Sequence, residues 1–142
     1  MNAEKLTQKA LETLQTAQSM AQENSNQYLT PEHLLYALLD QDGGLIGTLF
    51  TRMGVDCDTV LAELDTVISN LPRVSGAGSE VYASSETGKV LAFAERVAKN
   101  MQDDFISVEH LMLGIFQHPT RDIKRIFIAH GITKDEIGRA HV

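Results

Sequence analysis

The sequence contains little of the material that many specialised folds require. Its 142 residues include one cysteine, three prolines and no tryptophan, and only 6% of them are aromatic. The single cysteine, Cys57, excludes an internal disulfide framework and a four-cysteine zinc site, and it favours a reducing compartment. No apolar run approaches the roughly 18 residues of a membrane span, and the first twenty residues do not form a secretory signal. We therefore expect a cytoplasmic protein of about one domain with no membrane partner.

Positive charge is also scarce. The chain has 12 Lys and Arg against 19 Asp and Glu, which gives a formal net charge of −7 and a pI of about 5.1. Phosphate-backbone binding needs clustered cations, so we expect no nucleic-acid partner. Residues 126–142 have a helix-turn-helix pattern, but the matching segment 50–64 carries carboxylates where bases would be contacted. DNA binding is therefore only a minor hypothesis.

The sequence repeats itself at an offset of 77 residues. Residues 28–35, YLTPEHLL, align without a gap on residues 105–112, FISVEHLM. Between residues 14 and 55 the same offset gives nine identities, mostly at apolar or turn positions. Because core positions and helix ends resist change for steric reasons, this distribution indicates a duplicated packing unit.

Apolar spacing and end signals predict helices throughout both units. Residues 6–21 and 90–101 have the three- and four-residue spacing of long amphipathic helices. Thr30 and Ser107 are suitable N-caps for a second helix in each unit, and Gly54 and Gly131 can end a third in the left-handed conformation. We predict an all-α domain over residues 1–142, with eight helices in two pseudo-symmetric four-helix repeats. Repeat 1 covers 5–70, a linker covers 71–83, where only Val81 and Tyr82 favour an extended backbone, and repeat 2 covers 84–142.

No segment meets the requirements of a known catalytic or metal motif. The segment Ser85–Val90 resembles the end of a phosphate-binding loop but lacks its first glycine and its final hydroxyl residue. His33 and His110 stand at equivalent positions near helix starts, and their spacing does not suit metal ligation. Residues 40–44 lack the alternating oxygen ligands of a calcium loop. We predict no catalytic residue, no metal site and no cofactor in this chain.

The duplicated elements resemble the Clp N-terminal domain family. The resemblance rests on TPEHLL at 30–35, ISVEHL at 106–111, LTQKA at 6–10 and the Gly-Val and Gly-Ile pairs that follow each third helix. Within the family, the linker LPRVSGAG at 71–78 is most similar to that of ClpB disaggregases. This resemblance implies a longer, hexameric parent whose AAA+ modules bind ATP and magnesium and which works with DnaK-type chaperones. This chain would then be no enzyme itself and would capture unfolded or aggregated polypeptide.

The candidate binding residues come from two sources. Helical spacing allows an apolar groove floor, although apolar residues at this spacing are more often core. The floor candidates are Leu14, Val90, Leu91, Phe93 and Phe105. The resemblance also implies substrate contacts at Thr7, Asp103 and Glu109, which could equally be ordinary helix-start and loop residues. Two other functions stay open: docking of a folded adaptor, as in ClpC- or ClpA-type unfoldases, and regulation by a free-standing Clp-repeat protein.

Overall fold

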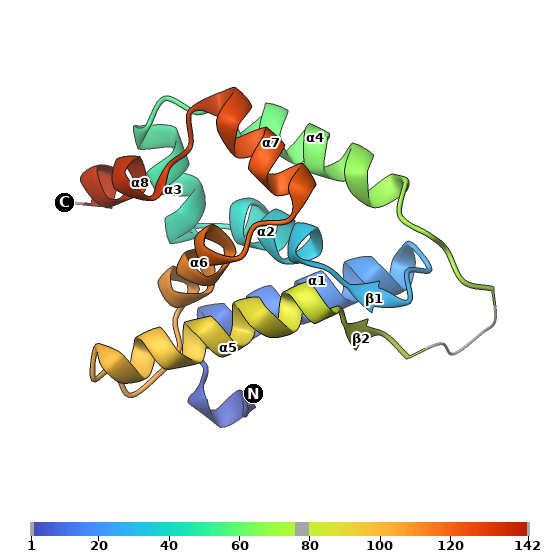
Figure 1. Cartoon of the computed structure of the whole chain (residues 1–142), viewed down its shortest axis with the longest axis horizontal. Helices are drawn as coiled ribbons and strands as arrows, with labels where there is room; N and C mark the ends of the chain where they lie inside the picture. The colour runs from blue at the N-terminus through green and yellow to red at the C-terminus, as the bar shows by residue number, and fades with distance from the viewer. Residues whose placement is uncertain (1, 76–79, 142) are drawn as a thin grey trace.

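The structure is a computed structural model that describes residues 2–75 and 80–141. This part of the chain contains eight α-helices, which confirms the predicted all-α class (Figure 1). In repeat 1 the helices are α1 Gln8–Glu23, α2 Pro31–Asp40, α3 Leu45–Arg52 and α4 Cys57–Ser69. In repeat 2 they are α5 Ser85–Asn100, α6 Val108–Gln117, α7 Arg121–His130 and α8 Lys134–His141. Three short elements accompany them: a 3-10 helix η1 Ala3–Lys5 and the strands β1 Tyr28–Leu29 and β2 Tyr82–Ala83.

The helix ends follow the local signals in the sequence. Thr7 and Ser84, which are 77 residues apart, each cap the first helix of their repeat by accepting a backbone N–H three residues later. Thr30 and Ser107 cap α2 and α6 in the same way. Gly131 ends α7 with φ +65°, so the predicted left-handed helix end is confirmed there. Helix starts in the two repeats are therefore built alike.

The two repeats exchange backbone segments. The Ser84 N–H donates to the Leu29 carbonyl at 3.0 Å, where β2 pairs in parallel with β1. Seventy-seven residues away, with the repeats interchanged, the Thr7 N–H donates to the Ile106 carbonyl, also at 3.0 Å. In each repeat, the residues before the first helix thus lie beside the residues that precede the second helix of the other repeat. The sequence predicted the extended backbone at Tyr82 but not its partner.

The outer helices also pack across the repeats. Helix α3 packs on α8, and α4 packs on α7, so the third helix of each repeat lies beside the fourth helix of the other (Figure 1). The repeats are therefore intertwined and are not two lobes with a groove between them. Part of the predicted linker, residues 76–79, lies outside the described residues.

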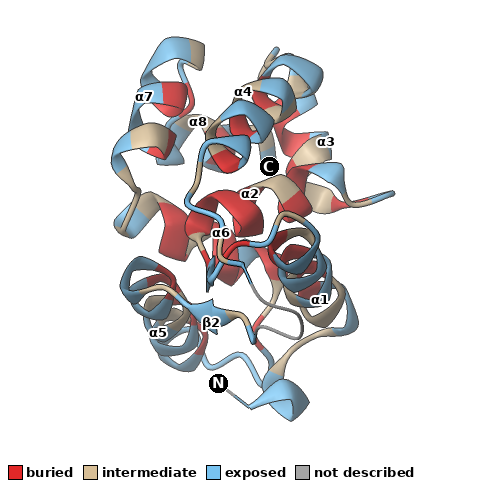
Figure 2. Ribbon diagram, turned by 90° about the vertical axis from the view of Figure 1, so that its right-hand side faces the viewer, coloured by how far each residue is buried: buried red, intermediate tan, exposed pale blue. Residues whose placement is uncertain are grey.

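A large core lies around α2 and α6, and buried residues of these helices lie in the centre of the molecule (Figure 2). Phe50, Leu34 and Leu111 are completely buried in it. Helices α5 and α6 approach closely: a Cβ added to Gly114 would lie 2.4 Å from the carbonyl oxygen of Val90. Burial of this core holds both repeats in one unit, because residues from both contribute to the same apolar cluster.

Candidate functional site

The candidate site lies where the start of the chain meets the loop between α5 and α6. We call the group Lys5, Thr7, Met101, Asp103 and Phe105 the α5–α6 loop surface. Met101 and Phe105 are 58% and 53% exposed, so two large apolar side chains of one loop face solvent. Backbone pairing of Ile106 with residues 5–7 holds the loop against the N-terminal segment.

A cavity of about 270 Å³ opens beside Phe105. It is lined by Lys5, Glu95, Ala98, Lys99, Asp103, Asp104, Phe105 and Ile106. Sequence reasoning predicted Asp103 and Phe105 but missed the two lysines. Exposed lysines on a helix or near a terminus usually belong to a solvated face, so spacing alone gave no signal for them. The cavity combines an apolar wall with charges of both signs.

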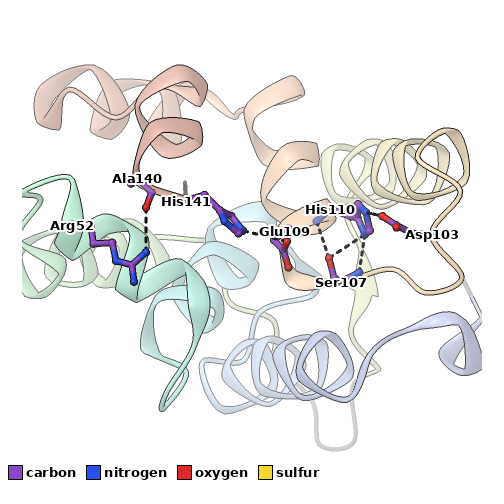
Figure 3. A network of polar contacts seen from close by, with 7 residues as sticks. All are labelled: Arg52, Asp103, Ser107, Glu109, His110, Ala140 and His141. Atoms are coloured by element: carbon purple, nitrogen blue, oxygen red, sulfur yellow. Dashed lines mark hydrogen bonds and ion pairs between the residues drawn. The ribbon is translucent and has the colours of Figure 1, made fainter.

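His110 holds Asp103 in place (Figure 3). The Asp103 Oδ2 atom lies 2.8 Å from His110 Nε2. On the other side of the ring, the Ser107 backbone N–H donates to Nδ1 at 2.9 Å. Since Nδ1 accepts this hydrogen bond, the proton of the neutral ring lies on Nε2 and points at the carboxylate. The ring is buried while the Asp103 side chain is 45% exposed, so the histidine anchors a charge that faces solvent.

Repeat 1 has the same arrangement with a neutral partner. The Thr30 N–H donates to His33 Nδ1 at 2.9 Å, and Nε2 lies 2.9 Å from the Asn26 Oδ1 atom. His33 is completely buried, and burial lowers its pKa from 6.5 to about 4 because the charged ring would be poorly solvated. His33 is therefore neutral at pH 7 and serves a structural role.

The predicted floor residues do not all face one groove. Val90 is fully buried and is a core residue, so it is removed from the candidate surface. Leu14 and Leu91 are partly buried and pack against the core. Phe93 lies edge-on to His118, with 5.9 Å between the ring centroids, and beneath the Arg96 guanidinium. These contacts place it on a different part of α5 from the cavity-lining residues. Helical periodicity could not separate core residues from surface residues here, because neighbouring apolar positions share one broad helix face.

Glu109 borders a different cavity, of about 360 Å³, between α3, α6 and α8. Its apolar lining includes Ile46, Leu49, Met101, Met112, Leu113 and Phe116. The Glu109 Oε2 atom lies 3.4 Å from His141 Nε2 (Figure 3). Of the three residues implied by the resemblance, Thr7 and Asp103 belong to the α5–α6 loop surface. Glu109 lies outside that surface, and the cavity that it borders touches the surface only through Met101.

Within residues 2–75 and 80–141, no group of three or more His, Cys, Asp or Glu side chains gathers where it could hold a metal ion. No helix in the same part of the chain is both long and apolar enough to cross a membrane. The cavity beside Phe105 can accommodate an apolar side chain while its charged rim contacts polar backbone or side-chain groups.

Comparison with known proteins finds one family and a consistent set of relatives. Residues 5–130 match the Clp repeat (R) N-terminal domain. The chain is 34% identical over 139 residues to the chaperone protein ClpB of Brucella suis, covering 98% of this chain and 16% of the relative. It is 40% identical over 116 residues to ClpB of Leptolyngbya boryana, covering 82% of this chain and 13% of that protein. The chain thus spans about a sixth of the length of these relatives.

Solved structures show the same fold. The Hsp104 N-terminal domain of Candida albicans matches with a TM-score of 0.83 at 22% identity, covering 95% of this chain and 87% of that one. The N-terminal domain of the ClpV1 ATPase from Escherichia coli matches with a TM-score of 0.81 at 24% identity, covering 96% and 83% of the two chains. At these identities the likeness concerns the fold alone.

Proposed function

Because the chain belongs to the Clp repeat N-terminal domain family, we propose that it is the substrate-binding N-terminal domain of a ClpB-type, ATP-dependent protein disaggregase of the cytoplasm. Support comes from relatives named chaperone protein ClpB, which align with nearly the whole chain. In this proposal the domain captures unfolded or aggregated polypeptide and is not itself an enzyme. ATP and magnesium bind in AAA+ modules elsewhere in a hexameric parent, which works with DnaK-type chaperones.

The observation that carries the proposal is the exposed apolar pair of the α5–α6 loop surface. Met101 and Phe105 lie more than half exposed on one loop, and Phe105 lines a cavity. An unfolded chain exposes apolar side chains that the folded state would bury, so burial against Phe105 is favourable for many different sequences. The Asp103 carboxylate and the Thr7 hydroxyl lie at the edge of this surface, where backbone amides of a bound segment can donate to them.

The surface is small, so a single contact is weak. Burying one aromatic side chain contributes roughly 1.5–3 kcal/mol, and immobilising the bound chain offsets part of this. Weak, sequence-tolerant binding suits a capture domain, because substrates share only exposed apolar segments. In a hexameric parent, six such surfaces would strengthen the attachment through avidity.

The remaining predicted residues have supporting positions in this proposal. Leu14 and Leu91, packed against the core from α1 and α5, support the helices that carry the surface. Phe93 stands against His118 and contributes apolar surface on another side of α5. Glu109, at the cavity between α3 and α6, would contact a substrate only if the bound segment extends across Met101, which lines the same cavity.

Titration of the isotope-labelled domain with reduced, unfolded casein, followed by NMR, tests the proposal. We expect chemical-shift changes centred on Met101, Asp103 and Phe105, and at least about fivefold weaker binding for Phe105→Ser, because the loss of one buried ring costs more than 1 kcal/mol. Ile128→Ser is the matched control, since Ile128 is 74% exposed on α7, away from the loop. Equal weakening by both substitutions would contradict the proposal.

Docking of a defined partner, as in adaptor-binding ClpC- or ClpA-type unfoldases, is the second candidate. It is favoured by a solved structure described as a complex of the ClpV N-domain with a VipB peptide, whose fold resembles this one with a TM-score of 0.71. A free-standing Clp-repeat regulator would need such a partner too. A scrambled peptide separates the candidates: a capture domain binds both orders of the same residues, whereas a docking domain binds only one.

A further inference from the structure

The α5–α6 loop surface has a pseudo-symmetric counterpart at the strands β1 and β2. Shifting by 77 residues in either direction takes Phe105 to Tyr28, Lys5 to Tyr82 and Thr7 to Ser84. The pairing of β1 with β2 brings Tyr28 and Tyr82 together in space, just as the pairing of residues 5–7 with Ile106 brings Lys5 near Phe105. The counterpart carries two aromatic rings where the loop surface carries one ring and one lysine.

Tyr28 and Tyr82 stand side by side on the solvent face of the strand pair. They are register partners in the parallel ladder, so their side chains leave the ribbon on the same face. Their side chains are 48% and 55% exposed. The next residue of β1, Leu29, points to the opposite face and is buried against Ala17 and Ala37. The ribbon therefore buries Leu29 on one face and offers an aromatic pair on the other.

A cavity of about 360 Å³ lies beside Tyr28 of the aromatic pair. Its lining comes from β1, the start of α5 and the segment after α4, and it includes Tyr28, Leu71, Pro72, Val74, Ser84 and Glu86. The Glu86 carboxylate is exposed in the first turn of α5. A second carboxylate, Glu80, accepts a hydrogen bond from the Tyr82 hydroxyl at 2.9 Å. The site thus combines apolar walls, the aromatic face of Tyr28, with Tyr82 as its strand neighbour, and negative charge.

The nearby charges favour a cationic occupant. Two carboxylates, Glu80 and Glu86, outnumber the one cation of the adjoining segment, Arg73, whose guanidinium donates to the Asn24 Oδ1 atom at 2.9 Å. At the loop surface, by contrast, lysines and carboxylates line the same cavity and oppose one another. An ammonium or guanidinium group is attracted to the face of a tyrosine ring, and Arg and Lys also carry apolar stems that pack on surfaces such as Leu71 and Val74.

We propose that this counterpart is a second polypeptide-binding site, specific for an arginine or lysine side chain in an extended segment. The cation lies over the ring of Tyr28 with the Glu86 carboxylate beside it, and the stem packs on Leu71 and Val74. The site shares with the proposed function only the polypeptide nature of its ligand. One domain would then hold an unfolded chain at two chemically different points, an apolar one and a basic one.

A matched pair of pentapeptides tests the proposal on the full chain. The probe is N-acetyl-Ala-Val-Arg-Val-Ala-amide, and its control replaces arginine with citrulline, which has nearly the same shape and no charge. NMR titration should show shifts at Tyr28, Tyr82 and Glu86 with the arginine peptide and at least about fivefold weaker binding of the citrulline peptide. Equal affinities, or arginine-peptide shifts confined to Phe105 and its neighbours, would overturn the proposal.

Three variants distinguish this site from the loop surface. Tyr28→Leu keeps apolar bulk and removes the aromatic face, and Glu86→Gln removes one exposed charge with little effect on folding. Each should weaken the arginine peptide about threefold or more, whereas Phe105→Leu should leave it unchanged. If casein still shifts Phe105 while these variants leave the arginine peptide unaffected, the second site is refuted and the capture proposal stands. If casein shifts neither region but the arginine peptide behaves as expected, the capture proposal fails alone.

Discussion

His33 and His110 occupy the same position in the two repeats and make the same helix cap, yet their surroundings differ. Each ring accepts the backbone N–H of its own N-cap residue through Nδ1. On the far side, His33 meets the neutral amide of Asn26, which is 3% exposed, while His110 meets the Asp103 carboxylate, which faces solvent. In repeat 1 the histidine is a fully buried structural residue. Repeat 2 uses it to present a charge at the candidate site.

This contrast shows how a duplicated unit can divide its tasks. The cap geometry depends on the ring and the N-cap backbone, which both repeats retain. The charge beside the ring depends on the position that is Asn26 in repeat 1 and, 77 residues later, Asp103 in repeat 2. A single change of amide to carboxylate therefore adds a solvent-facing charge at the end of one repeat that the other repeat lacks.

The largest expected effect comes from removing His33. His33→Leu deletes the cap to Thr30 and removes the ring nitrogen from the buried Asn26 Oδ1 atom, which keeps only the Asn24 amide as donor, so we expect a loss of about 3 kcal/mol in the free energy of unfolding. His110→Leu should cost about 1–2 kcal/mol, because Asp103 can turn to water. Urea unfolding of both variants checks the comparison. Similar losses would show that the two histidines are equally structural.

The pH dependence of stability should reflect the titration of His33. Its folded pKa of about 4 lies below the unfolded value of 6.5, so the unfolded chain binds an extra proton between these values. Stability from this group is therefore intact above pH 6.5 and falls by about 2–3 kcal/mol as the pH drops to 4. His33→Gln keeps a neutral capping-box side chain, and it should remove this contribution to the change of unfolding free energy with pH. Parallel stability curves for the two proteins between pH 4 and 6.5 would contradict the assignment.

The helix contacts offer a second contrast between the repeats. Position 114 is glycine, and an added Cβ would lie 2.4 Å from the Val90 carbonyl oxygen, whereas the matching residue of repeat 1 is Ala37. Gly114→Ala forces α5 and α6 apart, and we expect a loss of about 2 kcal/mol despite the better helix propensity of alanine. The reverse change, Ala37→Gly, should cost about 1 kcal/mol through propensity. Thermal unfolding distinguishes the two, and a Gly114→Ala protein as stable as the parent would disprove the close contact.

Local features of the fold were predictable from the sequence, and the pairing of distant segments was not. The offset repeat, the caps at Thr30 and Ser107 and the glycine ends of the third helices depend on neighbouring residues, so spacing reveals them. The packing of α4 on α7 and of α3 on α8 depends on which repeat each apolar face meets. Packing within each repeat and packing across the repeats both satisfy the same amphipathic pattern, so only the folded chain distinguishes them.

The candidate site was predictable to a similar extent. Phe105 and Asp103 lie in a polar loop, where an aromatic residue has little reason to be buried, and they do lie at the surface. Val90 and Leu91 are neighbours in an amphipathic helix, and only the close approach of Gly114 shows that Val90 belongs to the core. Lys5 reaches the site only because residues 5–7 pair with Ile106, a contact between residues about 100 positions apart that spacing does not encode.

The smallest effect on stability, and the sharpest test of the divided repeats, should come from Asp103→Asn. This change gives repeat 2 the partner that repeat 1 already has in Asn26. Because the Asp103 side chain is nearly half exposed, the free energy of unfolding should change by less than about 1 kcal/mol. The charge at the α5–α6 loop surface is lost, however, so casein binding should weaken about two- to threefold without a matching loss of stability. The reciprocal change, Asn26→Asp, places a carboxylate beside a buried ring and should raise the pKa of His33, because the imidazolium gains a counter-charge. If Asp103→Asn weakened folding as much as binding, the carboxylate would be part of the helix cap, and the distinction between the repeats would fail.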